Sequence, residues 1–339
     1  MTKKVAVIGA GSWGTALAVL LSNKGIRVGL WVYEDEVFDQ ITIHRENSRY
    51  LPGIKIPEDI EVFKDQGRAI KGADIIVLAV SSQAVRIVAR DIKGFIPEEQ
   101  IVVNVAKGLE LVSLKRLSQV IEEEIPQAKV AVLSGPSHAE EVALGIPTTI
   151  VSAAREQDTS EIVQDIFMCP EFRVYTNHDV IGVEMGGALK NIIALAAGVS
   201  DGLGHGDNTK AALMTRGIAE ITRLGKAMGA EAETFAGLTG VGDLIVTCTS
   251  VHSRNRKAGI MLGSGKSLDE TLAAVGMAVE GVYTCEAAYG LARKMGVEMP
   301  ITEQLYKILF EGKEPEEAVR GLMLRDRTYE TEMGPDKWL

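Results

Sequence analysis

A glycine-rich turn between a strand and a helix is the feature that most restricts how this chain can fold. Residues 5–14 read VAVIGAGSWG, with Gly9, Gly11 and Gly14 spaced G-x-G-x-x-G after an apolar run. The first glycine permits a tight turn, the second lets the backbone approach a pyrophosphate, and the third allows close packing of helix on strand. The N-terminus of the next helix offers free N–H groups to phosphates. In this order the motif predicts a dinucleotide-binding unit rather than a glycine turn without a ligand.

The first half of the chain alternates apolar runs with helical patterns. The apolar runs lie at 4–10, 27–33, 73–80, 101–107, 129–135, 148–153 and 171–179. Helices are expected at 12–24, 83–92 and 113–124, with another between the last two runs. Continuous apolar runs are typical of strands that a parallel sheet buries on both faces. The alternation therefore predicts an α/β fold with a doubly wound sheet of Rossmann type.

The β pattern stops near Val180, and the rest of the chain is predicted to be helical. Helices are expected at 180–200, 208–228, 252–262, 280–295 and 301–320. Such a shift indicates a domain boundary. We expect a dinucleotide-binding domain at 1–180 and an all-α, substrate-binding and catalytic domain at 181–339.

Composition excludes several classes of function. The formal net charge of −10 argues against a nucleic-acid partner, and an anionic small substrate would need a local basic pocket. The three cysteines contain no CxxC pair and the histidines lack ligand spacing, so no disulfide framework and no metal site are expected. No stretch reaches the ~20 apolar residues that span a bilayer. Reduced thiols and the lack of a span predict a cytoplasmic protein.

The end of the second strand reads LWVYEDE and carries Tyr33, Glu34 and Asp35. An acidic residue about 20 positions beyond the glycine turn normally binds a ribose 2′-hydroxyl. No arginine in this segment could neutralise a 2′-phosphate, so the charge favours NAD over NADP. The alternative is a solvated acidic strand end.

Lys190 and Asn191 interrupt a helix that is otherwise apolar from Ala188 to Ala197. Desolvating an ammonium is expensive unless it is paired, so such a lysine is either salt-bridged or catalytic. Glu184 is a poor local partner, because a separation of six residues places it on another face of the helix.

Other segments supply polar groups that could meet Lys190. Lys107 ends the fourth strand, at the edge where a doubly wound sheet binds ligands. Gly135, Ser137 and Ala139 follow the fifth strand. The remaining candidates lie in the second half of the chain and are Asp243, Thr247, Ser253, Arg254 and Asn255.

Each of these candidates also has a purely structural interpretation. Lys107 could be a solvated strand end, Arg254 an ordinary basic helix start, and Asp243 a helix cap. If the groups do converge, a partly desolvated Lys190 has its pKa lowered towards the working pH and can transfer the alcohol proton of a dehydrogenase. Asp243 would orient it, and Arg254 beside a helix N-terminus would hold an anion.

Several blocks together resemble the glycerol-3-phosphate dehydrogenases that use NAD(P), over most of the chain from Val5 to Glu280. These blocks are GAGSWGTALA, ENSRYLPG, NVAKGLE, LSGPSHAEEV, GGALKNIIALAAGVSDGLGHGDNTKAAL, GVGDLIVTC and SRNRKAG. The resemblance implies a Rossmann domain, a helical domain and a homodimer. It also implies reversible reduction of dihydroxyacetone phosphate to sn-glycerol 3-phosphate, which supplies phospholipid synthesis.

The resemblance also implies roles for single residues. Lys190 resembles the proton-transferring lysine of the family, with Asn191 beside it, and Lys107 and Asp243 match its substrate-binding and lysine-orienting positions. Thr247, Gly135, Ser137 and Ser253 fall among its substrate contacts, and Arg254 and Asn255 where it holds the phosphate and reaches the cofactor. Ser12, Trp13, Ala139 and Glu280 match cofactor contacts. Bacterial members often carry a basic residue after the second strand, where this chain has VYEDE; NAD is therefore expected, with NADP possible.

Two rival functions share some of these features. A β-hydroxyacid or sugar-acid dehydrogenase of the same two-domain plan would bind a carboxylate in place of the phosphate. A non-catalytic dinucleotide sensor would keep the glycine turn and lose the proton-transfer group. Because Lys190, Lys107 and Asp243 are all present, the sequence disfavours a sensor.

Overall fold

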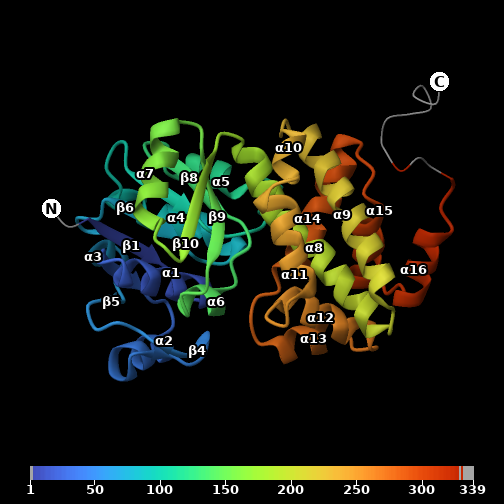
Figure 1. The fold of residues 1–339 in the computed structure, drawn as a ribbon, viewed down its shortest axis with the longest axis horizontal. Coiled ribbons are helices and arrows are strands. Elements are labelled where there is room, and N and C mark those ends of the chain that lie inside the picture. Colours follow the sequence, from blue (N-terminus) through green and yellow to red (C-terminus); the bar gives the residue numbers. More distant parts are fainter. Residues whose placement is uncertain (1–2, 328–329, 331–339) are drawn as a thin grey trace.

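The computed structural model describes residues 3–327 and 330, and within them an α/β half precedes a helical half (Figure 1). The strands are β1 Lys4–Ile8, β2 Arg27–Trp31, β3 Glu46–Asn47, β4 Leu51–Lys55, β5 Glu61–Phe63, β6 Ile75–Leu78, β7 Ile101–Asn104, β8 Lys129–Ser134, β9 Thr148–Ala154 and β10 Phe172–Asn177. The helices of the first half are α1 Ser12–Asn23, α2 Asp35–Asp39, α3 Gln66–Ile70, α4 Val85–Ile92, α5 Leu117–Glu124, α6 Ala139–Ala143 and α7 Gln157–Phe167. Those of the second half are α8 Val180–Gly202, α9 Asp207–Ala227, α10 Ala232–Phe235, α11 Asp243–Thr249, α12 Arg254–Gly263, α13 Leu268–Val275, α14 Glu280–Met295, α15 Pro300–Phe310 and α16 Pro315–Met323.

The main sheet has the strand order β10-β9-β8-β7-β6-β1-β2-β5. From β7 through β5 every neighbouring pair is parallel, and the winding reverses between β1 and β6. This reversal is the switch point of a doubly wound sheet, and ligands bind beyond the carboxyl ends of the strands there. The predicted Rossmann-type fold is confirmed.

Two strands, β9 and β10, run antiparallel to the rest of the sheet. β9 and β10 extend the sheet as expected, but β9 pairs antiparallel with β8. The reason lies in the link between β8 and β9, which contains only the short helix α6 (Ala139–Ala143). A parallel connection needs a longer crossover that returns the chain to the opposite edge of the sheet. The chain instead turns back at the carboxyl edge, and this keeps Ser137 and Ala139 beside the ligand-binding edge.

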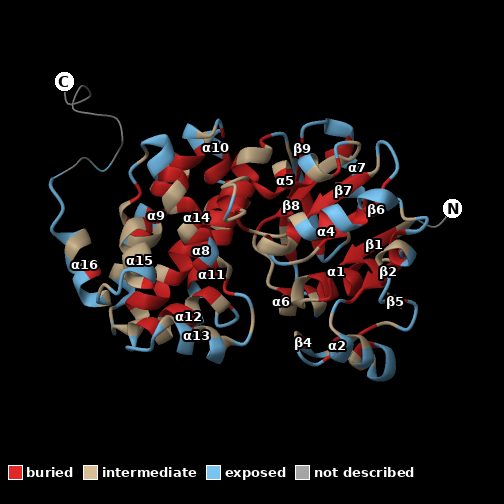
Figure 2. Cartoon of the chain, turned by 180° about the vertical axis from the view of Figure 1, so that it is seen from behind, coloured by how far each residue is buried: buried red, intermediate tan, exposed pale blue. Residues whose placement is uncertain are grey.

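Both faces of the sheet are covered, and Figure 2 shows that the strands and α8 form the buried centres of the two halves. Val5, Ala6, Val7 and Ile8 of β1 are fully buried, in agreement with the continuous apolar run in the sequence. In the helical half, α8 is surrounded by other helices. By length and hydropathy α8 could cross a membrane, but 83% of its most apolar window is buried inside the protein.

Glycines allow α12 to pack directly on α8. A Cβ on Gly198 would lie 2.2 Å from the carbonyl oxygen of Arg256, and one on Gly259 would lie 2.1 Å from that of Leu195. Only glycine permits this approach, because real side chains never come so close to a backbone oxygen. The start of α12, with Arg254 and Asn255, is thereby placed beside the middle of α8.

Two predicted helices differ from the structure. The helix expected at 301–320 is wrong as a single element, because the chain forms α15 and α16 with a turn between them. Gly312 has φ +69°, a left-handed conformation that ends a helix, and Pro315 starts the next one. The helix expected at 113–124 begins only at Leu117, because Arg116 is its extended N-cap residue.

Candidate active site

A cavity of about 1050 Å³ lies between the carboxyl edge of the sheet and the helical half. At one end it is lined by the glycine turn, and at the other by residues of α8, α11 and α12. Ligand pockets usually enclose roughly 300–1,000 Å³, so this one has room for a dinucleotide together with a small substrate. It is the place at which the residues predicted from the sequence should meet.

The glycine turn has the geometry that its spacing predicts. Gly9 has φ +115°, and a Cβ there would lie 2.5 Å from the carbonyl oxygen of Ala79 on the neighbouring strand end. A Cβ on Gly14 would lie 2.0 Å from the carbonyl oxygen of Gly9. These two glycines are therefore required by packing.

Gly11 has a different reason to lack a side chain. Within the described residues, nothing lies within 4 Å of the position of a Gly11 Cβ, which faces the cavity. Gly11 is also the N-cap of α1 and provides no side-chain cap, so the first N–H groups of the helix remain available to an acceptor. An open backbone face at a helix N-terminus fits a pyrophosphate.

The segment ENSRYLPG, for which the sequence suggested no catalytic or binding residue, forms hydrogen bonds that support the glycine turn. The buried Asn47 amide donates to the carbonyl oxygen of Ala10 at 2.8 Å and to the Thr15 hydroxyl at 2.9 Å. Ser12 donates to the backbone oxygen of Tyr50 at 2.6 Å. Trp13 lines the cavity, and its buried indole N–H has no hydrogen-bond partner among the described residues.

The acidic end of β2 lies at the cavity wall, with Tyr33 and Glu34 both lining it. Tyr50 donates from its hydroxyl to the Glu34 carboxylate at 2.8 Å, which fixes that side chain. The pKa of Tyr50 is raised by burial and by this bond to Glu34. A fixed carboxylate at this position can accept hydrogen bonds from ribose hydroxyl groups.

Basic residues that the local sequence did not reveal lie near the same strand end. Lys64, which follows β5, pairs with Asp35 at 2.6 Å, and Arg49 pairs with Glu36 at 3.6 Å. Neither base lines the cavity, whereas Glu34 does. The ion pairs hold both bases against the outer acids, so the face towards the cavity stays acidic.

Lys190, Lys107 and Asp243 form one cluster at the other end of the cavity. The Nζ of Lys190 lies 2.5 Å from Oδ1 of Asp243, and the Nζ of Lys107 lies 2.8 Å from Oδ2. Asp243 is only 1% exposed and Lys190 6%. Thr247 also accepts from Lys190, at 2.7 Å. The partner of the buried lysine is therefore Asp243 of α11, and Glu184 instead pairs with Arg116 of the first half.

The charges in this cluster set the protonation behaviour of Lys190. Burial lowers its pKa to about 8, Asp243 opposes the fall, and the nearby Lys107 ammonium adds to it. Burial alone would raise the pKa of Asp243, but the attraction of Lys107 and Lys190 outweighs it and keeps the pKa below its usual value. The carboxylate thus stays ionised, and Lys190 can exchange a proton near neutral pH.

Lys107 is held from the sheet side as well. Its Nζ donates to the carbonyl oxygen of Gly135 at 2.7 Å and to the Ser137 hydroxyl at 3.3 Å. Gly135 has φ +141° just after β8, which aims its carbonyl at the ammonium. Ala139, at the start of α6, lines the same cavity.

Asn191 and Asn255 connect the helices around the cluster. Asn255 donates from Nδ2 to Oδ1 of Asn191 at 2.9 Å and accepts from the N–H of Gly281 at 2.9 Å. Asn191 in turn donates to the backbone oxygen of Lys107 at 3.4 Å. These bonds fix α8, α12 and the start of α14 around the lysine pair.

The start of α12 presents its basic side chain to the cavity. Ser253 caps the helix by accepting from the N–H of Arg256 at 3.2 Å. Arg254 lines the cavity, where it donates to the carbonyl oxygen of Ala278 at 3.3 Å. Its place beside free helix N–H groups suits a phosphate.

Glu280 also lines the cavity, but its carboxylate is bound within the protein. It accepts from the N–H of Ser82 at 3.0 Å and from the Ser82 hydroxyl. Burial raises the pKa of Glu280, and the bonds from Ser82 oppose the rise. No sequence pattern indicates Ser82, because its importance depends on a contact 198 residues away.

Two histidines that the sequence left without a role line the cavity too. The rings of His138 and His252 lie 5.9 Å apart. Burial and the nearby ammonium groups of Lys190 and Lys107 lower the pKa of His138. Among the described residues no group of three or more His, Cys, Asp and Glu side chains is placed to hold a metal ion.

Comparison with known proteins agrees with this geometry. Residues 4–160 match the family model of the NAD-dependent glycerol-3-phosphate dehydrogenase N-terminus, and residues 179–320 match that of its C-terminus. A glycerol-3-phosphate dehydrogenase (NAD(P)+) of Moorella thermoacetica is 60% identical over 98% of this chain and 99% of that protein. One of Clostridium perfringens is 56% identical over 96% and 99%.

A solved structure gives the same result for the fold. The crystal structure of glycerol-3-phosphate dehydrogenase from Coxiella burnetii superimposes with a TM-score of 0.93 at 41% identity, over 96% of this chain and 99% of that one. The two halves of the chain therefore share their fold with that enzyme over nearly their whole length. The chain is a member of the NAD-dependent glycerol-3-phosphate dehydrogenase family.

Proposed function

We propose that this NAD(P)-dependent oxidoreductase interconverts sn-glycerol 3-phosphate and dihydroxyacetone phosphate with Lys190 as its proton carrier. The observation that carries the proposal is the buried Lys190–Asp243 pair at 2.5 Å, whose lysine lines the same cavity as the glycine turn. The names of the curated relatives support the reaction.

The proton step follows from the state of Lys190. In the reducing direction the substrate carbonyl carbon gains a hydride and its oxygen gains a proton. When bound, the reduced nicotinamide supplies the hydride. Lys190 gives a proton from Nζ to the oxygen and becomes a neutral amine, which solvent protonates again. A pKa of about 8 makes both states of the lysine accessible near neutral pH.

The charge of the site fits a phosphorylated substrate. One carboxylate, Asp243, is shared by two ammonium groups, so the cluster carries one net positive charge. Arg254 adds a further positive charge to the cavity wall. In a chain of formal charge −10, this basic region is a local attraction for a small dianion. We assign the phosphate to Arg254 and the N-terminus of α12.

The residues at the other end fit a dinucleotide. Gly9, Gly11, Gly14 and the first turn of α1 would hold the pyrophosphate, and Glu34 would accept from a ribose hydroxyl. The open face at Gly11 supports this fit, because the surrounding protein does not explain the lack of a side chain there. Trp13 and Ala139 would flank the cofactor, and Glu280 would lie near it.

The cofactor preference is the first testable prediction. Initial rates with dihydroxyacetone phosphate should give a higher kcat/KM with NADH than with NADPH, because Glu34 repels a 2′-phosphate. Glu34→Gln should reduce that preference by about tenfold or more. The control is Asp39→Asn, which removes a charge from α2 away from the cavity.

Three outcomes would count against these assignments. A wild-type preference for NADPH would contradict the role of Glu34. An equal effect of Asp39→Asn would show that general charge, and not the position of Glu34, sets the preference. Failure to reduce dihydroxyacetone phosphate with either cofactor, combined with turnover of a β-keto acid, would favour the carboxylate-specific alternative.

Further properties belong to the same proposal. We expect a cytoplasmic homodimer that supplies glycerol 3-phosphate to phospholipid synthesis and has no nucleic-acid partner. We also propose that the dinucleotide-binding and helical domains divide near Val180, between the end of β10 and α8. The ends of the proposed ranges 1–180 and 181–339, at 1–2, 328–329 and 331–339, lie outside the described residues.

A further inference from the structure

Three distant parts of the chain meet beside Lys107. They are the 3₁₀ turn Ser82–Ala84 before α4, the residue Gly108 after β7, and Glu280 at the start of α14. A Cβ on Gly108 would lie 2.6 Å from Cβ of Ser82 and 3.4 Å from Oε2 of Glu280. The backbone that carries Lys107 is therefore packed directly against the junction of the two halves.

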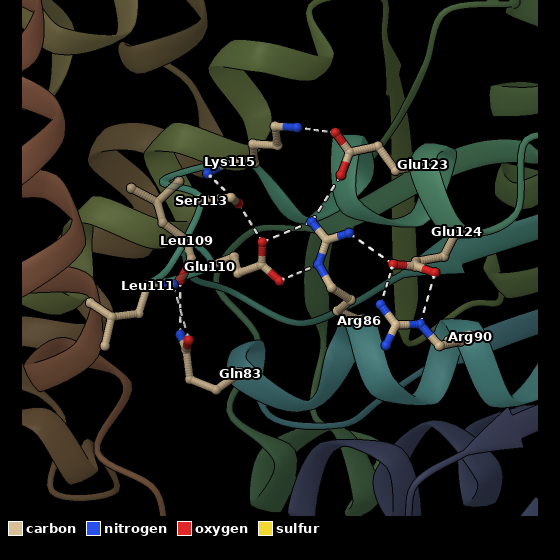
Figure 3. A network of polar contacts seen from close by, with 10 residues as sticks. All are labelled: Gln83, Arg86, Arg90, Leu109, Glu110, Leu111, Ser113, Lys115, Glu123 and Glu124. Carbon is tan, nitrogen blue, oxygen red and sulfur yellow. Dashed lines mark hydrogen bonds and ion pairs between the residues drawn. The ribbon is translucent and has the colours of Figure 1, made fainter.

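Gln83 binds this backbone with both ends of its carboxamide. Its Nε2 donates to the carbonyl oxygen of Leu109 at 2.8 Å, and its Oε1 accepts from the N–H of Leu111 at 3.0 Å. Figure 3 shows the side chain reaching from the turn before α4 to these two backbone groups. Gln83 also donates to the Ser82 hydroxyl, which is itself bound to Glu280.

An ion-pair network holds the same segment from the next turn of α4. Arg86 binds both oxygens of Glu110, at 2.6 and 2.8 Å, and also pairs with Glu123 and Glu124 of α5 (Figure 3). Two parallel bonds from one guanidinium define the position of the carboxylate as well as its charge. Residue 110 is thus fixed three positions beyond Lys107.

The leucine side chains of the segment point the other way, into the helical half. Leu109 is 1% exposed and belongs to the same apolar cluster as Met185 and Leu189 of α8. Leu111 and Leu114 pack against that cluster. The segment 107–114 is therefore attached to the turn before α4 through its backbone, to α4 through Glu110, and to the helical core through its leucines.

We propose that Gln83 is a positioning residue that holds the backbone of 109–111 so that the Lys107 ammonium stays on Asp243. Gln83 is not among the residues that line the cavity, and its bonds reach the backbone two to four positions beyond Lys107. The inference rests on the proposed role of Lys107 in the site. No sequence pattern singled out Gln83. Through this residue, the packing of the two halves against each other determines where the reacting groups lie.

The chemistry of the contact requires glutamine. One group must donate to a carbonyl oxygen while the other accepts from an N–H, and a carboxamide does both. Methionine has nearly the same shape but makes neither strong bond. Glutamate can still accept from Leu111, yet it places a second oxygen against the Leu109 carbonyl. Substitutions at Gln83 can therefore remove the bonds with little change in packing.

The test compares Gln83→Met and Gln83→Glu with the control Gln127→Met. Gln127 also donates to two backbone oxygens, those of Lys93 and Ile96, at 3.3 and 3.1 Å. It precedes β8 and is not among the residues that line the cavity. Thermal unfolding shows that each variant folds, and steady-state rates with NADH and dihydroxyacetone phosphate follow.

We expect both Gln83 variants to lower kcat/KM for dihydroxyacetone phosphate by about tenfold or more, because small misplacements of a binding group are costly. The KM for NADH should change less than twofold, roughly the scatter of such a measurement. The control should keep both parameters. Because only glutamine can bind both backbone partners, neither variant should reach the wild-type rate.

The pH dependence of kcat distinguishes a positioning role from a purely structural one, because loss of stability alone would not shift it. The groups facing Lys190 are Asp243, Thr247 and the Cys248 thiol of α11, Lys107, and His138 before α6. Because the Lys107 ammonium lowers the pKa of Lys190, its displacement should raise that pKa. Lys190 must be protonated to donate, so the alkaline limb of the kcat profile should move to higher pH in Gln83→Met and not in Gln127→Met.

The possible results separate this inference from the proposed function. Folded Gln83 variants with the kinetics of the control overturn the positioning role while the wild-type reaction stands. If Gln83→Met does not fold, Gln83→Glu decides in the same way; failure of both to fold would show a role in stability and also overturn the proposal. A wild-type enzyme that does not reduce dihydroxyacetone phosphate would refute the proposed function itself.

Discussion

Asp243 is the residue on which the geometry of the candidate site depends. Its carboxylate holds Lys190 of the helical half with one oxygen and Lys107 of the α/β half with the other. Removing one partner of a buried ion pair typically costs roughly 3–5 kcal/mol, because the remaining charge is left without compensation. The apolar surroundings that make Lys190 conspicuous in the sequence are thus tolerated only because this carboxylate meets it.

Arg254 gives a prediction at the same scale. If it binds the substrate phosphate, Arg254→Ala should raise the KM for dihydroxyacetone phosphate by about tenfold or more, since a charge-assisted bond is lost. The KM for NADH should rise much less. Steady-state kinetics with each substrate varied in turn provide the measurement.

The control for Arg254 is Lys266→Ala, which removes one positive charge from the exposed turn after α12. It should leave both KM values near those of the wild type. A rise in the KM for NADH alone in Arg254→Ala would show that the guanidinium serves the cofactor and not the phosphate.

At the scale of elements, the N-terminus of α15 is bound by a buried acid from α9. Glu220 accepts from the N–H of Ile301 at 2.6 Å and from that of Thr302 at 3.2 Å. Burial raises the pKa of Glu220 to about 7, and the bonds from α15 oppose the rise without cancelling it. The folded protein therefore holds a proton that the unfolded chain releases near pH 4.5.

This proton predicts how stability depends on pH. Because the folded pKa is raised, the contribution of Glu220 is fully present below the unfolded value and is lost as pH rises towards 7. The free energy of unfolding should fall by about 2–3 kcal/mol between pH 4.5 and 8 from this group. Glu220→Gln should remove that part of the slope.

Denaturant unfolding at several pH values measures the effect. Glu233→Gln on α10, an exposed acid, is the control and should keep the wild-type slope. Equal slopes in the wild type and in Glu220→Gln would contradict the account, because Glu220 would then titrate alike in the folded and unfolded chains.

The elements also show where sequence patterns stop being informative. The buried strands and the long helix α8 were predicted because their apolar periodicity is local. The direction of β9 was not, since it depends on where the chain turns after β8. The break between α15 and α16 carried a signal in Gly312 and Pro315, but the helical pattern on either side obscured it.

For the whole molecule, the arrangement of the two halves side by side (Figure 1) matters because residues of both halves line the cavity. Lys107, Lys190, Asp243 and Arg254 could be named from the sequence because each is a charged residue in an unusual local setting, and because their blocks resemble a known family. Their roles in catalysis and binding remain predictions, while their convergence on one cavity is observed.

Other residues at this junction could not be predicted. Ser82, Gln83 and Tyr50 are ordinary polar residues in the sequence, and their partners lie 16 to 198 positions away. Nothing local distinguishes a glutamine that holds a backbone from one that faces solvent. Such contacts follow from the fold, which the sequence patterns describe only coarsely.

The most direct test of the account compares Lys190→Ala with the wild type in two assays on the same preparations. NADH binding, followed by nucleotide fluorescence, should be retained, because Lys190 is not part of the glycine turn that we expect to hold the nucleotide. Turnover of dihydroxyacetone phosphate should fall by about 10²–10⁴-fold, the usual contribution of a general acid. A variant that binds NADH and still turns over at nearly the wild-type rate would contradict the assignment of Lys190 as the proton carrier.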